Sequence, residues 1–207
     1  DPKRLEGQAL APTGLAAVHV DDLVDRLVML VGELDLRAAQ WENGSRTHRP
    51  SPTSPHRVIV IDEAATLTAL LPDRRQREAV DAALGALLSR GRALGFTVVL
   101  TTVDPTKEVL RWRSLLSTRV AYRSEAGHAD LTLGGGAHAA GAAIELIPET
   151  TPGVAYVRAD GAQDVRRVRT AHISDERITE LTAWATATSP VVVNLVSEPA
   201  TAAAGGA

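Results

Sequence analysis

The sequence predicts an α/β fold in which helices cover both faces of a mostly parallel sheet, a three-layer sandwich. Two observations carry this prediction. Short apolar runs rich in Val and Ile alternate along the chain with longer segments of helical periodicity. Strands that follow one another through helices pair in parallel, because the helical crossover returns the chain to the same end of the sheet.

The composition is that of one sizeable domain with an aliphatic core. Of 207 residues, 44% are hydrophobic and only 3% aromatic, so Ala, Val, Leu and Ile must fill the interior. The net charge of −3 gives no overall attraction to nucleic acid, so such a contact needs a local basic patch. The absence of Cys excludes disulfides and thiolate metal sites. We expect no membrane span and no signal peptide, since no suitable apolar run is present.

The first expected helix and strand precede residue 62. Within residues 20–40, Leu recurs at spacings of four, three and four, which predicts an amphipathic helix with Asp21 or Asp22 as its N-cap. A polar stretch rich in Pro and Ser follows, which indicates an exposed loop. The run "RVIVI" (57–61) is continuous and apolar, as is typical of a strand covered on both faces.

A second helix and two further strands are expected next. Asp73 should cap a helix over roughly 74–94, and residues 95–103, "GFTVVLTTV", predict another buried strand. We expect a third helix around 106–116 and a shorter strand in "STRVAYR" (117–123), which would extend the parallel sheet. Four apolar residues of the second helix should face inward: Val80, Leu84, Leu87 and Leu88.

The last third of the chain predicts a hairpin, a helix and a tail. Two alternating runs around Asp160 and Gly161 indicate a β-hairpin, and residues 174–188 a helix capped by Ser174. We expect one domain over residues 1–188. Residues 189–207 form a low-complexity C-terminal tail that should be disordered toward its end.

Two adjacent acids, Asp62 and Glu63, directly follow the first expected strand. In open parallel sheets, ligands gather beyond the carboxyl ends of the strands. An Asp there can hold Mg²⁺ as the ion bridges two phosphates, and a neighbouring Glu can accept a proton from the attacking water. Four apolar residues followed by Asp-Glu form a Walker B pattern. A strand that simply ends at a solvated turn is equally compatible with it.

The sequence does not contain the phosphate-binding loop that accompanies such a pair. That loop, G-x-x-x-x-G-K-[ST], wraps phosphates with backbone N–H groups and reaches the terminal ones with a Lys. Neither Lys3 nor Lys107 follows a Gly. The Gly-rich residues 133–143 have no Lys and no helix-opening Ser or Thr, so we expect a flexible turn there.

Seven stretches stand in a definite order and spacing. They are "DPKRLE", "VIVIDEAATL", "LLSRGRALGFTVVLTTVDPTKEVL", "LLSTRVAYR", "LTLGGGAHAAGAA", "IPETTPGVAYVR" and "VRRVRTAHISDERI". Together they resemble the FtsK/SpoIIIE family of DNA-pumping ATPases over about residues 1–180, most closely the actinobacterial branch with plasmid-transfer proteins of the TraB type. The resemblance implies a RecA-like P-loop fold, truncated at the N-terminus, because the family's Asp-Pro-Lys segment lies downstream of the phosphate loop.

The resemblance also implies roles for single residues. Asp62 matches the acid associated with Mg²⁺, and Glu63 matches the catalytic base. Thr102 lies where the family has a Thr-Gln pair that senses the γ-phosphate. Val103 takes the Gln position and departs from the pattern, since a Val cannot hydrogen-bond phosphate or water. Arg92 resembles an Arg that acts in trans on a neighbouring subunit's nucleotide, although an ordinary exposed helix end would look the same.

Basic residues flank the third expected helix and the strand after it: Arg111, Arg113, Arg119 and Arg123. The resemblance implies that such residues line the pore of a ring and grip DNA phosphates without reading bases. A second cluster lies on the expected hairpin: Arg166, Arg167 and Arg169. For any single Arg, a solvated surface position is an equally good interpretation.

The expected function is therefore ATP-driven translocation of double-stranded DNA by a homo-oligomeric ring, a hexamer, with ATP and Mg²⁺ bound between subunits. We expect a cytoplasmic protein held at the inner face of the cell membrane through an N-terminal region outside this chain. Without a phosphate loop, the chain alone should not hydrolyse ATP. Two alternatives stay open: a protein-exporting ATPase like those of type VII secretion, and a degenerate module that serves ring assembly or regulation without hydrolysis.

Overall fold

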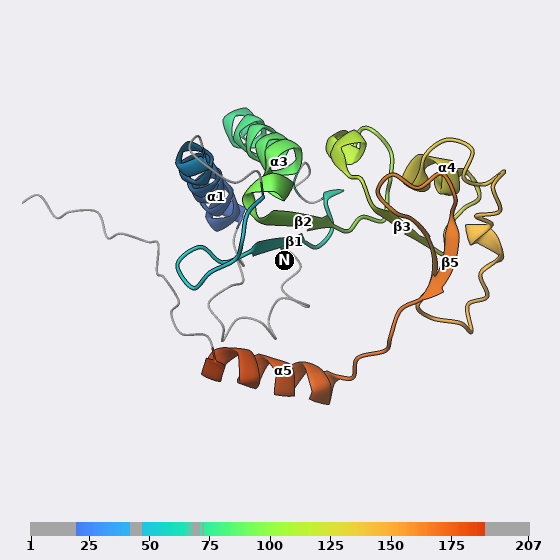
Figure 1. The fold of residues 1–207 in the computed structure, drawn as a ribbon. Coiled ribbons are helices and arrows are strands. Elements are labelled where there is room, and N and C mark those ends of the chain that lie inside the picture. The colour runs from blue at the N-terminus through green and yellow to red at the C-terminus, as the bar shows by residue number, and fades with distance from the viewer. Residues whose placement is uncertain (1–19, 42–46, 66, 68–70, 72, 189–207) are drawn as a thin grey trace, which may run out of the picture.

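The computed structural model describes residues 20–41, 47–65, 67, 71 and 73–188. The expectations for "DPKRLE" and for the C-terminal tail lie outside the described residues. In chain order the elements are α1 (Val20–Trp41), β1 (Arg57–Ile61), α3 (Arg74–Leu94), β2 (Phe96–Leu100), η2 (Arg111–Leu115), β3 (Arg119–Tyr122), α4 (Gly127–Leu133), η3 (Ile144–Leu146), β4 (Val154–Arg158), β5 (Arg166–Arg169) and α5 (Asp175–Thr188). The strands form two separate sheets (Figure 1).

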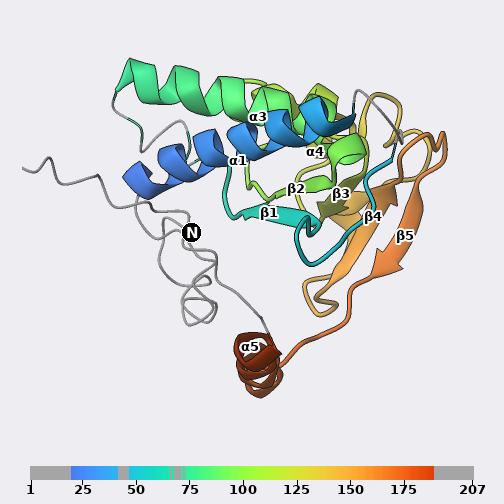
Figure 2. The same cartoon turned by 60° about the vertical axis from the view of Figure 1, so that its left-hand side comes forward.

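The first sheet is the expected parallel pair. β1 and β2 run in register from Arg57 opposite Phe96 to Ile61 opposite Leu100, and α3 is the crossover between them. α1 and α3 lie side by side over one face of this sheet (Figure 2). Their buried Leu residues, among them Leu34 and Leu84, form one core with Phe96. The expected strand–helix–strand crossover is confirmed.

The opposite face of this sheet is open in the part of the chain that the structure describes. Val58, Val60 and Val99 are 61%, 64% and 42% exposed, while Ile59 and Ile61 point into the helical layer. The expectation that "RVIVI" is covered on both faces is therefore wrong for the described residues, and two layers are seen in place of three. An apolar run shows that both faces of a strand are apolar, but covering them requires a second layer of elements.

The second sheet is antiparallel, in the order β3–β4–β5. The prediction that the strand at 117–123 extends the parallel sheet is wrong. The expected helix at 106–116 is a turn followed by the short 3₁₀ helix η2, so no crossover helix returns the chain to the parallel sheet. The hairpin around Asp160 and Gly161 is confirmed, with Gly161 at φ 73° in the loop between β4 and β5.

A second core lies under the antiparallel sheet. α4 and the turns after it cover one sheet face through buried residues that include Ala129, Leu133 and Ile144. The Gly-rich segment forms these turns, as expected. Figure 1 places this unit beside the α1–α3 layer, with residues 101–118 as the connection.

The helix caps are only partly as expected. Asp73 caps α3 by accepting a hydrogen bond from the N–H of Arg75, and Ser174 accepts one from the N–H of Arg177 before α5. α1 already includes Val20, so Asp21 and Asp22 lie inside the helix and the N-cap prediction is wrong. The Leu spacing that marks a helix does not mark the residue at which it begins.

α5 stands apart from both sheets in both views (Figures 1 and 2). None of its residues is buried. Among the described helices, none combines the length and the apolar character needed to cross a membrane.

Candidate functional site

The acids after β1 and the threonines after β2 meet at one edge of the parallel sheet. The Thr101 hydroxyl donates to Oδ1 of Asp62 at 2.9 Å and accepts from the N–H of Glu63 at 3.0 Å. The Thr102 hydroxyl lies 3.2 Å from Oε1 of Glu63. Because parallel strands end at the same edge of the sheet, residues 39 positions apart form one hydrogen-bonded cluster. Asp62, Glu63, Thr101 and Thr102 are called the carboxylate cluster below.

Glu63 has an unusual backbone for a large side chain. Its φ is +61°, and no other non-glycine residue among those described has a positive φ. Such a conformation costs on the order of 1–3 kcal/mol and persists only where the surroundings hold it. The side chain is 9% exposed, and its Oε1 also accepts the N–H of Ala65 at 3.3 Å. The backbone conformation of Glu63 and the hydrogen bonds of its side chain therefore both fix the position of its carboxylate.

Asp62 is the more accessible acid and suits Mg²⁺. This ion takes oxygen ligands and is usually held by one or two carboxylates together with substrate phosphates. Half-buried Asp62, oriented by the Thr101 hydroxyl, supplies such an oxygen. The described part of the chain has no group of three or more His, Asp or Glu that could hold a metal alone.

Thr102 connects the cluster to the next turn, whereas Val103 does not. The Thr102 hydroxyl lies 2.9 Å from the carbonyl oxygen of Asp104, so it can donate either there or to Glu63. Val103 is 79% exposed. The N–H and the hydroxyl of Thr106 hold the pKa of the Asp104 carboxyl below its usual value, so this acid is charged at neutral pH.

Sequence reasoning missed Thr101, although it contacts both acids. Its position was the available signal: it is the first residue after β2, directly beyond the pair Ile61–Leu100. Its N–H donates to the Ile61 carbonyl at 3.0 Å, and its own carbonyl accepts from Ala64 at 2.7 Å. The ladder between β1 and β2 thus continues into the cluster.

Arg92 lies in the last turn of α3, away from the carboxylate cluster. Its side chain is 84% exposed and forms an ion pair with Asp160 in the loop of the hairpin. This pair joins the helical layer to the antiparallel sheet.

The four basic residues around η2 and β3 fall into two kinds. Arg111 pairs with Asp81 of α3 at 2.7 Å, and Arg123 pairs with Glu149 at 2.9 Å. Within the described part of the chain, Arg113 and Arg119 donate to backbone carbonyls and pair with no acid: Arg113 to Pro105 at 3.2 Å and Arg119 to Leu116 at 2.8 Å. The charges of Arg111 and Arg123 are thus partly offset by neighbouring acids, whereas Arg113 and Arg119 have no such neighbour among the described residues.

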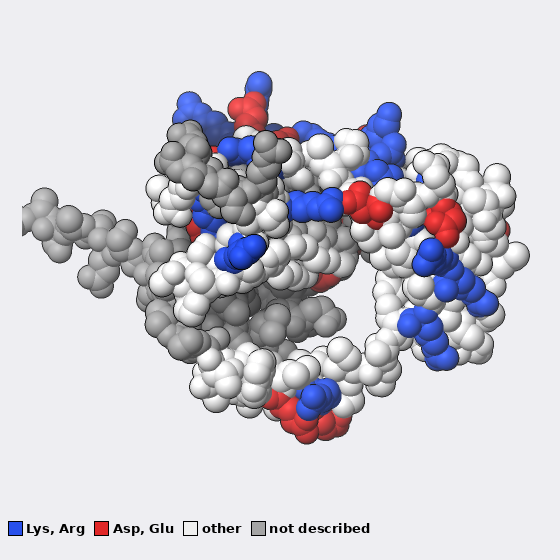
Figure 3. Space-filling view, in the orientation of Figure 1, with Lys and Arg blue, Asp and Glu red and all other residues white. Residues whose placement is uncertain are grey.

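The arginines of β5 form an exposed basic strip. Figure 3 shows basic side chains gathered over β5. Arg166 pairs with Asp164 at 3.2 Å, while Arg167 and Arg169 have no carboxylate partner among the described residues.

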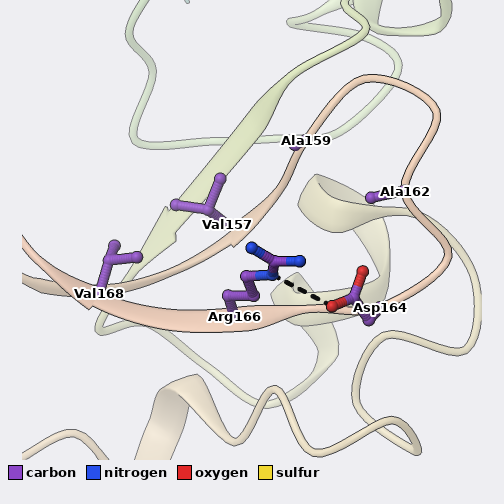
Figure 4. Close-up of a pocket in the computed structure, with 6 residues that line it drawn as sticks. All are labelled: Val157, Ala159, Ala162, Asp164, Arg166 and Val168. Atoms are coloured by element: carbon purple, nitrogen blue, oxygen red, sulfur yellow. Dashed lines mark hydrogen bonds and ion pairs between the residues drawn. The ribbon is translucent and has the colours of Figure 1, made fainter.

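A pocket of about 180 Å³ lies at this hairpin (Figure 4). Its lining is mainly aliphatic, with the Arg166–Asp164 ion pair at one side. Because it belongs to the antiparallel sheet, it is no part of the carboxylate cluster. The residues that line it are Val157, Ala159, Ala162, Asp164, Arg166 and Val168.

Comparison with known proteins shows a shared fold. No family model and no curated protein matches the sequence, but 16 chains among the solved structures match. One is the pCW3 conjugation coupling protein TcpA, in a monomer form with ATPγS, at 19% identity and a TM-score of 0.62. Another is the cytoplasmic domain of the Thermomonospora curvata type VII secretion ATPase EccC, at 22% identity and a TM-score of 0.56.

Each alignment covers 79% of this chain. It covers 49% of the TcpA chain and 20% of the EccC chain, so this chain spans about half of one and a fifth of the other. At these identities the likeness establishes a common fold, which in this chain is a mixed α/β fold with a parallel sheet and a separate antiparallel one.

Proposed function

We propose that this chain is part of an ATP-driven motor of the FtsK/SpoIIIE type, with a RecA-like P-loop core, that translocates double-stranded DNA. The observation that carries the proposal is the carboxylate cluster at the carboxyl ends of two adjacent parallel strands. The fold shared with a conjugation coupling protein whose structure contains ATPγS supports it, as do the ordered motifs over residues 1–180.

The two acids have distinct parts in this proposal. Bound ATP with Mg²⁺ supplies the phosphoryl group that is transferred to water. Asp62 would hold the ion through its carboxylate, which the Thr101 hydroxyl orients. Glu63 would orient the attacking water and accept its proton. Its fixed backbone and the contact with Thr102 set the position of that carboxylate.

The end of β2 supplies hydroxyls and no amide. With Val103 in place of Gln, contact between β2 and the acids runs through Thr101 and Thr102. Sensing of the γ-phosphate would pass through Thr102, whose hydroxyl can switch between Glu63 and the Asp104 carbonyl.

Oligomer and DNA contacts complete the proposal. Arg92 would leave its exposed pair with Asp160 to reach the nucleotide of a neighbouring subunit in a hexameric ring. Arg113 and Arg119 would contact DNA phosphates more strongly than Arg111 and Arg123, whose charges are already offset by acids. The ring would work in the cytoplasm at the membrane's inner face, held by a region outside this chain.

The decisive experiment measures ATP hydrolysis with and without duplex DNA, on the longest motor domain that the gene encodes around these residues. DNA-stimulated turnover should fall roughly a hundredfold or more in Glu63→Gln. Glu78→Gln, an equal change on the exposed face of α3, should leave turnover unchanged. Turnover that survives Glu63→Gln would overturn the role of Glu63. No turnover in a chain that has a phosphate loop would favour the degenerate module.

A protein-exporting ATPase is the second candidate, and the match to EccC favours it. The same assay separates the two. Stimulation by an export-substrate peptide and not by duplex DNA would select export.

A further inference from the structure

Two arginines face each other across the antiparallel sheet. Arg119 of β3 and Arg158 of β4 are directly opposed in the register. Like charges in this position destabilise a sheet. Both side chains are half-buried, so they have not separated into water to relieve the repulsion.

Among the described residues, no acid pairs with either arginine. Nε of Arg119 donates to the Leu116 carbonyl at 2.8 Å, and Nη1 of Arg158 donates to the Leu133 carbonyl at 3.0 Å. Within the described residues, neither has a carboxylate at ion-pair distance, in contrast to Arg111 and Arg123. Each guanidinium has five N–H donors, and Nε of Arg158 is buried without a hydrogen-bond partner in that part of the chain.

The two guanidinium groups converge beside Gly134. A Cβ placed on this glycine would stand 2.9 Å from Nη1 of Arg158 and 3.5 Å from Nη1 of Arg119. The absence of a side chain at Gly134, whose φ is +98°, keeps this space open. Burial, and then the charges of Arg113 and Arg158, lower the pKa of Arg119. Positive charge is thus concentrated at one point next to the Gly-rich turn.

Capping of carbonyl groups does not by itself account for this arrangement. Each Leu carbonyl needs one donor, which a neutral side chain can supply without repulsion across the strands. A bound anion would offset the repulsion and use the remaining donors. The planar fork of Arg matches the oxygens of a phosphate group in particular.

We propose that Arg119 and Arg158 form a binding site for a phosphate group beside Gly134. The phosphate would come from the DNA backbone or from a nucleotide, and in naming these two sources the inference rests on the proposed function. The site itself rests on the register, the contacts and the convergence at Gly134. Arg158 is the member that the sequence did not single out.

The test compares three probes on the 207-residue chain: pyrophosphate, ATP with Mg²⁺, and a short fluorescein-labelled DNA duplex. Arg119→Gln and Arg158→Gln should each lower the affinity for the probe that binds at this site roughly tenfold or more. Arg177→Gln, an equal charge change in α5 at an exposed pair with Glu180, should have an effect below about twofold. Arg158→Lys should restore only part of the affinity, because it keeps the charge and loses the fork.

The pattern across the probes identifies the source. Weakened DNA binding with unchanged ATP binding assigns a backbone phosphate, and the reverse assigns a nucleotide. Pyrophosphate binding that depends on Arg119 and Arg158, with no binding of DNA or ATP, keeps the site and excludes both proposed sources of its phosphate, while the hydrolysis assay described above tests the proposed function separately. Affinities for all probes that are unaffected by the cluster variants, or lowered equally by Arg177→Gln, overturn the inference.

A second measurement needs no substitution, so it does not depend on whether the variants fold. In the wild-type protein with ¹⁵N-labelled arginine, pyrophosphate should shift the side-chain Nε–H resonances of Arg119 and Arg158. Shifts confined to other arginines, or no shifts, would overturn the inference without any substitution.

Discussion

At the scale of single residues, Arg37 is the buried charge on which the helical layer depends. Its side chain is 5% exposed. It pairs with Glu33 on the same helix and donates to the carbonyls of Leu94 and Pro55 at 2.8 and 2.7 Å. Its guanidinium carbon lies 4.6 Å from the centre of the Phe96 ring. One side chain thus joins α1 to the end of α3, to the loop before β1 and to β2.

Replacing Arg37 should therefore destabilise the fold strongly. Arg37→Met removes the donor to two carbonyls and leaves Glu33 with Arg57 as its remaining ion-pair partner among the described residues. The free energy of unfolding, measured with urea, should fall by about 3 kcal/mol. Arg90→Met is the matched control, since Arg90 makes an exposed pair with Asp35 and should cost less than about 1 kcal/mol. Equal losses in the two variants would contradict this view of Arg37.

His48 gives the same region a dependence on pH. Partial burial, and then the charge of Arg37, lower the pKa of His48, so the folded state favours the neutral ring. The unfolded chain takes up the proton near its ordinary value of about 6.5. The free energy of unfolding should thus have its full value above about pH 6.5. It should decrease as the pH falls below that value. Urea titrations on both sides of this pH test the slope, which His48→Gln should flatten. An unchanged slope in that variant would exclude His48 as its source.

At the scale of elements, α3 shows how a helix end depends on one glycine. Gly95 caps α3 with φ +83°, and a Cβ there would overlap the His48 ring. The chain can therefore turn from α3 into β2 at this residue only without a side chain.

Two Gly→Ala changes in and after α3 should have opposite signs. Gly95→Ala should lower the free energy of unfolding by about 2 kcal/mol or more, because strain and overlap add. Gly85→Ala should raise it by roughly 0.5–1 kcal/mol, because Gly85 lies inside the helix with open space beside it. Thermal and urea unfolding measure both. A loss in Gly85→Ala would show that this space is occupied in solution.

Elements were predictable where their signal is local. The extent of α3, its cap at Asp73 and the hairpin at Asp160 depend on nearby residues. Strand pairing is not local: "STRVAYR" reads as a strand, but only the structure shows that it joins β4 and not the parallel sheet.

In the candidate site, too, local features could be predicted from the sequence and contacts between distant residues could not. The acids at the end of β1 stand out in the sequence because they directly follow an apolar run. Thr101 and Arg158 do not, because their importance arises from the residue across the sheet, Asp62 for one and Arg119 for the other. Register between strands far apart in sequence is set by tertiary packing, which no local pattern contains.

At the scale of the whole molecule, two packed units are followed by a helix that packs on neither. α5 has no buried residue, and Trp184 is 66% exposed. Such a helix contributes little to the stability of the rest of the chain.

Removal of α5 should therefore leave the free energy of unfolding unchanged within about 0.5 kcal/mol. In the complete chain, iodide should quench the fluorescence of Trp184 and leave that of Trp112, which is 5% exposed, largely unquenched. Trp184→Phe combined with Trp41→Phe leaves Trp112 as the single tryptophan, and the difference between the variants gives the contribution of Trp184. A clear loss of stability on truncation, or an unquenched Trp184, would show that α5 packs on the domain in solution.

The parallel pairing of β1 with β2 also has a consequence for the order of folding. Arg57 and Phe96 become neighbours only after the whole of α3 has been placed between them, whereas β4 and β5 are joined by a short loop. Contacts between residues close in sequence form faster than those that must close a long loop. The hairpin should thus precede the parallel sheet, and Asp62 should meet Thr101 among the last events of folding. The carboxylate cluster then exists only in chains that have completed the helical layer.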